Sequence, residues 1–180
     1  MTFLPSVPGD TGLSDVFRAH PQLARPLLEA SEAILRGSSP LSAAERELIG
    51  AYVSGLNDCA YCRGVHTATA EAFGVAEATL VALLDDVDSA PVDDKLKPLL
   101  RYLRKLTLTP SRMSEADAAE VFAAGWDENA LHSAVSVCAL FNFMNRYVEG
   151  LGVASSPQGW AEAGVRIAEH GYLGGRDFLG

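Results

Sequence analysis

The chain has 180 residues, of which 48% are hydrophobic and 21% charged, which is typical of a globular protein and excludes a disordered or fibrous one. Its 14 Lys and Arg against 23 Asp and Glu give a net charge of -9, which has the wrong sign for binding the phosphate backbone of nucleic acid. A single domain over residues 1–180 is expected, because a chain of this length can bury a core without disulfides or metals.

The sequence offers neither a candidate signal peptide nor a candidate membrane span. Residues 1–10 lack Lys and Arg, and two prolines interrupt them. The longest apolar stretch, residues 135–144, is far shorter than the roughly 20 residues that cross a bilayer. Three cysteines do not make a secreted disulfide framework. We therefore expect a cytoplasmic protein that does not associate with membranes.

Apolar residues recur at spacings of three and four along most of the chain, while strand patterns are nearly absent, so we predict an all-α, compact helical bundle. After an irregular leader over residues 1–13, a helical segment over 14–36 is expected to be interrupted at Pro21 and Pro26. The further predicted helices cover about 42–55, 59–74, 77–86, 92–106, 114–124, 128–151 and, more weakly, 159–169.

Local signals fix the ends of two of these helices. Ser42 followed by Glu45 is a capping box, which marks a helix start. Asn57 and Asp58 are strong N-cap residues, so the next helix should begin beside Cys59, with Asp58 as its cap. Gly74 suits the left-handed cap at the other end of that helix.

The second of these helices carries a CxxCxxxH pattern formed by Cys59, Cys62 and His66. Helical spacing places all three on one face, with the imidazole nearer to Cys62. A helix N-terminus and a neighbouring imidazole are expected to lower the pKa of a thiol. A thiolate can attack a peroxide, and a second thiol can convert the resulting sulfenic acid to a disulfide. The pattern therefore predicts redox chemistry.

A proton acceptor is expected on the preceding helix. Glu47 shares a face with the small residues Ala51 and Ser54, and the short turn between the two helices makes them antiparallel neighbours. Glu47 is thus placed to approach His66 or Cys62, as a base or as the group that orients the imidazole.

The segment 45–49 (ERELI) together with Cys59, Cys62 and His66 resembles the signature of the alkylhydroperoxidase D (AhpD)-like group of the carboxymuconolactone decarboxylase superfamily. Residues 105–107 and 141–146 resemble the later half of its peroxidase-related branch. One position departs from the pattern, because Tyr61 stands where the founding enzymes have a second histidine between the cysteines.

The resemblance implies an all-helical, homo-oligomeric thiol peroxidase that needs no cofactor and no metal. It implies that Cys62 attacks the hydroperoxide, that Cys59 resolves the product, and that Glu47 and His66 relay protons. It also implies that an external dithiol or a redox adaptor protein reduces the disulfide.

Three other interpretations stay open. The same dithiol suits a thiol-disulfide reductase or adaptor that serves another peroxidase. The second of these is a ring-cleavage-pathway decarboxylase, although that chemistry needs no cysteine pair. The third is a non-catalytic helical oligomer, in which the thiols are structural or in which Cys59, Cys62, His66 and Glu47 bind zinc.

Three further features of the sequence give structural expectations. Cys138 lies in an apolar helix stripe, which indicates a buried thiol. Asn142, Asn145 and Arg146 form a polar cluster that we expect to serve capping, ion pairing or an oligomer contact. Gly64, in the middle of a predicted helix, indicates a close approach between helices.

Overall fold

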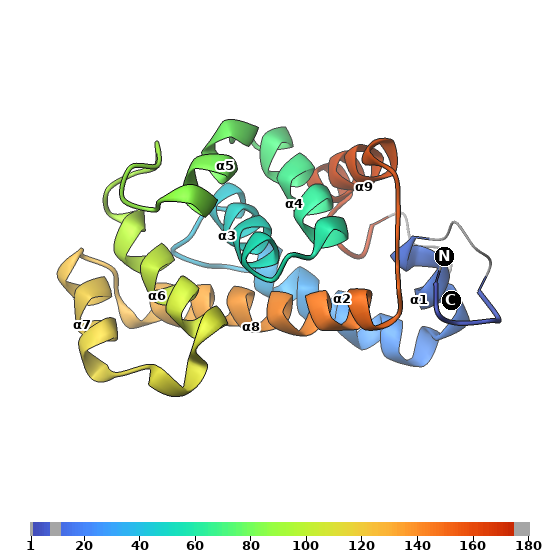
Figure 1. Cartoon of the computed structure of the whole chain (residues 1–180), viewed down its shortest axis with the longest axis horizontal. Helices are drawn as coiled ribbons and strands as arrows, with labels where there is room; N and C mark the ends of the chain where they lie inside the picture. Colours follow the sequence, from blue (N-terminus) through green and yellow to red (C-terminus); the bar gives the residue numbers. More distant parts are fainter. Residues whose placement is uncertain (1, 8–11, 175–180) are drawn as a thin grey trace.

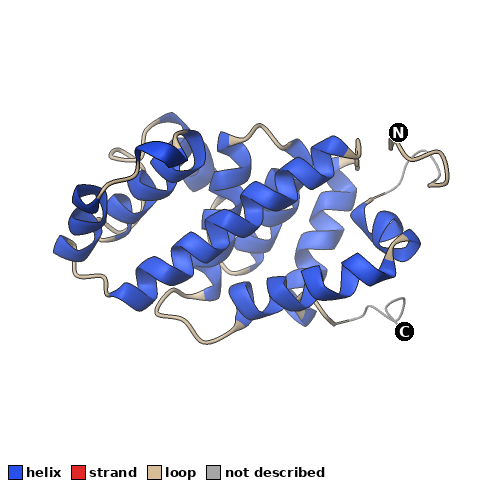
Figure 2. Ribbon diagram, turned by 90° about the horizontal axis from the view of Figure 1, so that it is seen from below, coloured by secondary structure: helices blue, strands red, loops and turns tan. Residues whose placement is uncertain are grey.

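The structure is a computed structural model that describes residues 2–7 and 12–174 of the chain. Within this part, the chain forms nine α-helices, one short 3₁₀ helix and no strand (Figure 2), which confirms the all-α prediction. Residues 1 and 8–11 of the predicted irregular leader lie outside the described residues. Residues 2–7 form turns, and Leu13 already belongs to the first helix.

The helices follow the chain order of Figure 1: α1 (Leu13–Ala19), α2 (Pro21–Arg36), α3 (Ala43–Leu56), α4 (Ala60–Ala72), α5 (Glu77–Asp85), α6 (Leu96–Leu108), the 3₁₀ helix η1 (Pro110–Arg112), α7 (Glu115–Ala123), α8 (Glu128–Gly150) and α9 (Pro157–His170). The start of α6 is later than predicted, because Asp93 Oδ1 accepts a hydrogen bond from Lys95 N at 2.8 Å in a turn before it. Among the described helices, none is both long and apolar enough to cross a lipid bilayer.

Three packing contacts position the candidate site. The helix α4 packs against both α3 and α9, and α3 packs in turn on the long α8, which extends along one side of the molecule in Figure 1. The main core contains buried residues of α3, α6 and α8, among them Tyr52, Leu103 and Phe141. The C-terminal helix α9 is thereby brought beside the cysteine-bearing helix, about 100 positions earlier in the chain.

The start of α3 agrees with the prediction, because the Ser42–Glu45 capping box is present, with Ser42 N donating to Glu45 Oε2 at 2.7 Å. The turn between α3 and α4 differs from the prediction at one residue. Asp58, however, is not the cap of α4, because it adopts a left-handed conformation with φ of 57°, which aspartate tolerates better than most residues. Cys59 is the N-cap instead, and its N–H donates to Ser54 O at 2.9 Å. Cys62 therefore lies in the first turn of α4.

The prediction that Pro26 interrupts the first helical segment is wrong. The chain does break at His20, before Pro21, but α2 continues through Pro26. A proline at the sixth position of a helix removes only one of its first hydrogen bonds. The neighbouring residues Ala24 and Leu28 are buried in a small cluster with Phe17, and this packing stabilises the continuous helix.

The helices α4 and α9 approach closely at glycines. A Cβ on Gly64 would lie 2.5 Å from ring atoms of Trp160, which confirms the predicted close approach. A Cβ on Gly164 would lie 2.6 Å from Ala68 Cβ and 2.8 Å from the backbone nitrogen of Thr69. The backbone atom cannot move aside as a flexible side chain would.

We therefore expect Gly164→Ala to lower the free energy of unfolding by about 1–3 kcal/mol, because it overpacks this contact. Urea unfolding measures the change. Gly150→Ala is the matched control, since a Cβ there meets nothing within 4 Å and helix propensity favours alanine by up to about 1 kcal/mol. Equal unfolding midpoints for G164A and the unsubstituted protein would contradict the close packing.

Candidate functional site

A buried carboxylate and an imidazole form the centre of the site. Glu47 on α3 is fully buried, and its Oε2 lies 2.7 Å from Nδ1 of His66 on α4. A histidine that donates Nδ1–H to a carboxylate has its ring orientation and tautomer fixed, which leaves Nε2 to accept a proton. The edge of Phe141 packs against the ring of His66 at 4.4 Å between centroids. The structure thus brings together Glu47 and His66 as predicted from the sequence.

Two residues that the sequence did not single out hold the other oxygen of Glu47. Arg36 Nη2, at the end of α2, lies 2.7 Å from Glu47 Oε1, and Tyr172 Oη donates to the same oxygen at 2.8 Å. Tyr172 follows α9, and its own N–H donates to Glu32 Oε2 at 2.6 Å. No local spacing links these residues to the cysteine motif, so only the packing of α2 and α9 reveals them.

These contacts set the ionisation of Glu47. Burial is the strongest single influence and would raise the pKa of this carboxyl. The hydrogen bond and charge of His66, the charge of Arg36 and the hydrogen bond of Tyr172 act together in the opposite direction. Their sum holds the pKa of Glu47 below its ordinary value, so Glu47 is a carboxylate at neutral pH.

The two cysteines of the motif are free thiols that lie in one buried cluster with Val16, Val148 and Val153. Cys59 is 0% exposed and Cys62 is 4% exposed. The spacing predicts that the two thiols lie on one side of the helix, and this shared cluster brings them together.

The pKa of Cys62 differs from the sequence expectation. Its hydrogen bond with Cys59, then its burial, raise the pKa of Cys62 well above the ordinary thiol value. A hydrogen bond with the Asn145 side chain acts the other way but is outweighed. The expectation of a lowered pKa is therefore wrong for this state, because packing removes the thiol from water. Cys62 rests as a thiol, and its ionisation requires a proton acceptor.

Two residues of the polar cluster on α8, Asn142 and Asn145, contact the turn that carries the cysteines. Asn145, which is buried, donates from Nδ2 to Ser54 Oγ at 3.0 Å, and its Oδ1 accepts from Asn57 Nδ2 at 2.9 Å. Asn142 Oδ1 also accepts from Asn57 Nδ2, at 3.2 Å. Together with the contact to Cys62, these bonds tie α8 to the turn that carries the cysteines. Asn145 is a site residue that sequence reasoning assigned to structure alone.

A cavity of about 80 Å³ opens beside the cysteine motif. Cys62 and His66 both line it, whereas Cys59 does not. Tyr61 also lines it, and its hydroxyl accepts a hydrogen bond from Leu13 N at 3.3 Å, which joins α1 to α4. The lining is mostly apolar and comes from α1, α2, α4, α8 and α9, with Tyr172 at its border. A small molecule in this cavity would contact Cys62 and not Cys59.

The remaining cysteine lies away from this cavity. Cys138 is buried, as predicted, with its sulfur 3.3 Å from Thr107 Oγ1, and burial raises the pKa of its thiol. In the part of the chain that the structure describes, no three His, Cys, Asp or Glu side chains lie close enough together to hold a metal ion.

Comparisons with known proteins agree with this fold. Residues 21–105 match the Carboxymuconolactone decarboxylase family. A peroxidase-related protein from Silicibacter sp. TM1040 has a similar structure, with a TM-score of 0.76 and 21% identity over 84% of this chain and 79% of that chain. An alkylhydroperoxidase AhpD core, a peroxidase-related protein from Ralstonia eutropha JMP134, has a TM-score of 0.75 and 19% identity over 83% and 78%. No curated protein matches the chain.

The helical architecture is thus that of the AhpD-like proteins. The match over residues 21–105 is to the carboxymuconolactone decarboxylase family, whose superfamily the sequence motifs also resemble.

Proposed function

We propose that this protein is a thiol peroxidase that reduces hydroperoxides through a Cys59–Cys62 disulfide cycle. One observation carries the proposal: Cys62 and His66 line the same cavity, and His66 is bonded at 2.7 Å to the buried carboxylate of Glu47. Because Cys62 borders the cavity and Cys59 does not, Cys62 is the attacking cysteine and Cys59 the resolving one.

The first step oxidises Cys62. His66, oriented by Glu47, accepts the thiol proton as the sulfur attacks the terminal oxygen of the hydroperoxide. A sulfur–oxygen bond forms, the oxygen–oxygen bond breaks, and the leaving alkoxide takes a proton to become an alcohol. The products are one alcohol and the sulfenic acid of Cys62. The raised pKa of Cys62 makes this step depend on the proton acceptor.

The second step forms the disulfide. The sulfur of Cys59 attacks the sulfur of the sulfenic acid, and water leaves as the disulfide forms. An external dithiol or a redox adaptor protein then reduces this bond by exchange, so the cycle uses no cofactor. We place the cycle in the cytoplasm, where disulfides are reduced.

The other interpretations fit the site less well. A thiol-disulfide adaptor needs no small-molecule cavity beside its reactive cysteine, whereas Cys62 lines one. A small peroxide would use that cavity. A decarboxylase has no use for the paired thiols.

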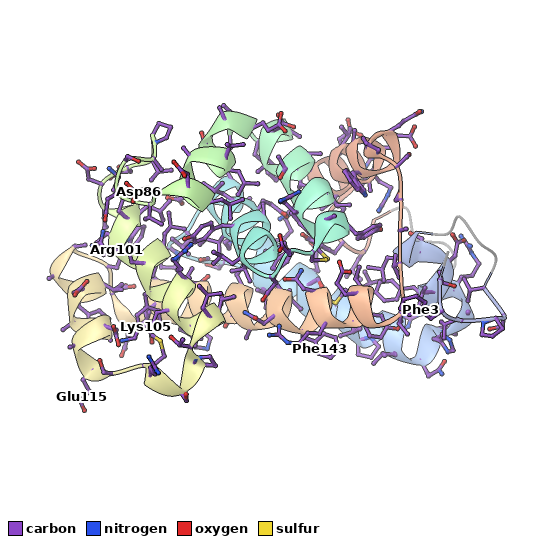
Figure 3. The ribbon with its side chains drawn as sticks, viewed as in Figure 1. Phe3, Asp86, Arg101, Lys105, Glu115 and Phe143 are labelled. Carbon is purple, nitrogen blue, oxygen red and sulfur yellow. The ribbon has the colours of Figure 1, made fainter. Side chains whose placement is uncertain are left out.

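We also propose that copies of the chain associate. Phe143 lies on the outer side of α8 (Figure 3), is 46% exposed, and stacks with Tyr147 at 6.0 Å between ring centroids. Exposed apolar groups of this kind are typical of contacts between subunits.

Mass spectrometry of the peroxide-treated protein tests the cycle. Trypsin cleaves after Arg46 and Arg63, so Cys59 and Cys62 occupy one peptide, 47–63. We expect one equivalent of tert-butyl hydroperoxide to remove two hydrogens from this peptide, because the disulfide forms within it. Cys138 lies on another peptide and is the internal control, which should remain a thiol.

A variant at Cys59 separates the roles of the two sulfurs. In Cys59→Ser, the sulfenic acid of Cys62 has no partner, so dimedone should label Cys62 after peroxide treatment. Retention of both thiols by the native protein in the presence of excess peroxide would overturn the proposed function.

A further inference from the structure

Arg166 is the one guanidinium on the wall of the cavity that also contains Cys62 and His66, within the described residues. It comes from α9, and its Nη1 is buried without a hydrogen-bond partner. The side chain also borders a shallow hollow on the outer surface of α9. Arg166 therefore lies between the cavity and the surface.

No acidic side chain in the described part of the chain is bonded to Arg166. Two carboxylates share the outer hollow with it, but Glu162 accepts from Gln158 at 2.8 Å and Glu169 lies 3.7 Å from His170. Arg166 as a whole is half-buried, but its Nη1 is removed from water without a partner, which is unfavourable. Arg36, by contrast, is paired with Glu47. The cavity thus has an excess positive group that an anion would satisfy.

The shape and lining of the cavity define the kind of anion. Its volume is about 80 Å³, against about 10–15 Å³ for one water on the same measure, so a few carbon atoms fit. Leu28, Leu35, Phe141 and Ile167 give the same cavity apolar walls. A carboxylate matches the planar fork of arginine, and a short hydrocarbon matches the walls.

We propose that this cavity binds small organic carboxylates through Arg166. If the peroxidase function proposed above holds, its preferred substrates are short alkyl hydroperoxides that carry a carboxylate. The carboxylate would bond to Arg166, and the peroxide group would lie toward Cys62 and His66 in the same cavity. The reaction is the one given above, in which the hydroperoxide becomes an alcohol and Cys62 a sulfenic acid.

Calorimetric titration with butanoate tests the site without any peroxide chemistry. Butyramide has the same shape but no charge, so we expect the unsubstituted protein to bind butanoate at least roughly tenfold more tightly. Arg166→Met should weaken butanoate binding by roughly 10- to 100-fold. Arg63→Met removes the same charge from an exposed position of α4 that borders a different hollow, and should bind butanoate as before.

Kinetics extend the test to substrates. We expect 3-hydroperoxy-3-methylbutanoate to exceed tert-butyl hydroperoxide in kcat/KM by at least roughly tenfold, and the ratio to approach one in R166M. Equal binding of butanoate and butyramide by the unsubstituted protein would overturn the inference, whether or not R166M folds. Specific butanoate binding without peroxide consumption would support the Arg166 site and contradict the peroxidase function.

Discussion

Replacing Cys62 with serine is expected to reduce peroxide consumption to that of the buffer, a loss of more than about 1,000-fold. Cys62 is the cysteine on the cavity wall, and a serine hydroxyl cannot accept the peroxide oxygen to form a sulfenic acid. Stopped-flow consumption of tert-butyl hydroperoxide, with dithiothreitol as reductant, measures the rate. The substitution replaces sulfur by oxygen and keeps the hydrogen-bonding capacity, so the fold should be retained.

Cys138→Ser is the matched control for this experiment. Cys138 is also buried, but it contacts Thr107 and Asn142 and does not line the cavity. We expect C138S to retain the rate of the unsubstituted protein. Undiminished turnover in C62S would exclude the proposed mechanism, even if C138S were also active.

Replacing Glu47 with glutamine is expected to have the second largest effect. The amide keeps the shape of the side chain but removes the charge that orients His66 and stabilises its protonated form. Because Cys62 rests as a thiol, we expect turnover to fall by roughly 100-fold or more. The guanidinium of Arg36 also loses its ionic partner, so the free energy of unfolding should fall by about 3–5 kcal/mol.

The pH dependence of stability separates the charge of Glu47 from its shape. The pKa of Glu47 is lower in the folded protein than its ordinary value of 4.5, so the unfolded chain binds more protons between the two values. The contribution of Glu47 is therefore complete above about pH 4.5 and is lost as the pH falls through the folded pKa. We expect the stability difference between the native protein and E47Q, measured by urea unfolding, to shrink as the pH falls below 4.5.

Glu71→Gln provides the control for both measurements. Glu71 is an exposed glutamate on α4, in the same helix as His66. We expect E71Q to match the unsubstituted protein in turnover and in the pH profile of stability. A pH profile of E47Q parallel to that of the native protein would contradict the assigned ionisation of Glu47.

Several features of the site follow from local sequence. The Ser42–Glu45 capping box sets the start of α3, and the short turn after Leu56 places α4 beside it. Helical periodicity then limits which residues of each helix can meet. Spacing predicted that Glu47 approaches His66 or Cys62, and the packing of the two helices selects His66. The conformation of Asp58 was not predictable from local sequence, because Asp can either cap a helix or adopt the left-handed conformation seen here.

The sequence by itself determined the helical class, the order of the helices and the cysteine, histidine and glutamate set, since each depends on neighbours within a few turns. Only the tertiary structure decided which remote side chains complete the site: Tyr172 lies 125 residues from Glu47, and Asn145 lies on a different helix from Cys62. It also decided that the pKa of Cys62 is raised. Burial and long-range pairing control ionisation, and both arise when distant helices pack around one cavity.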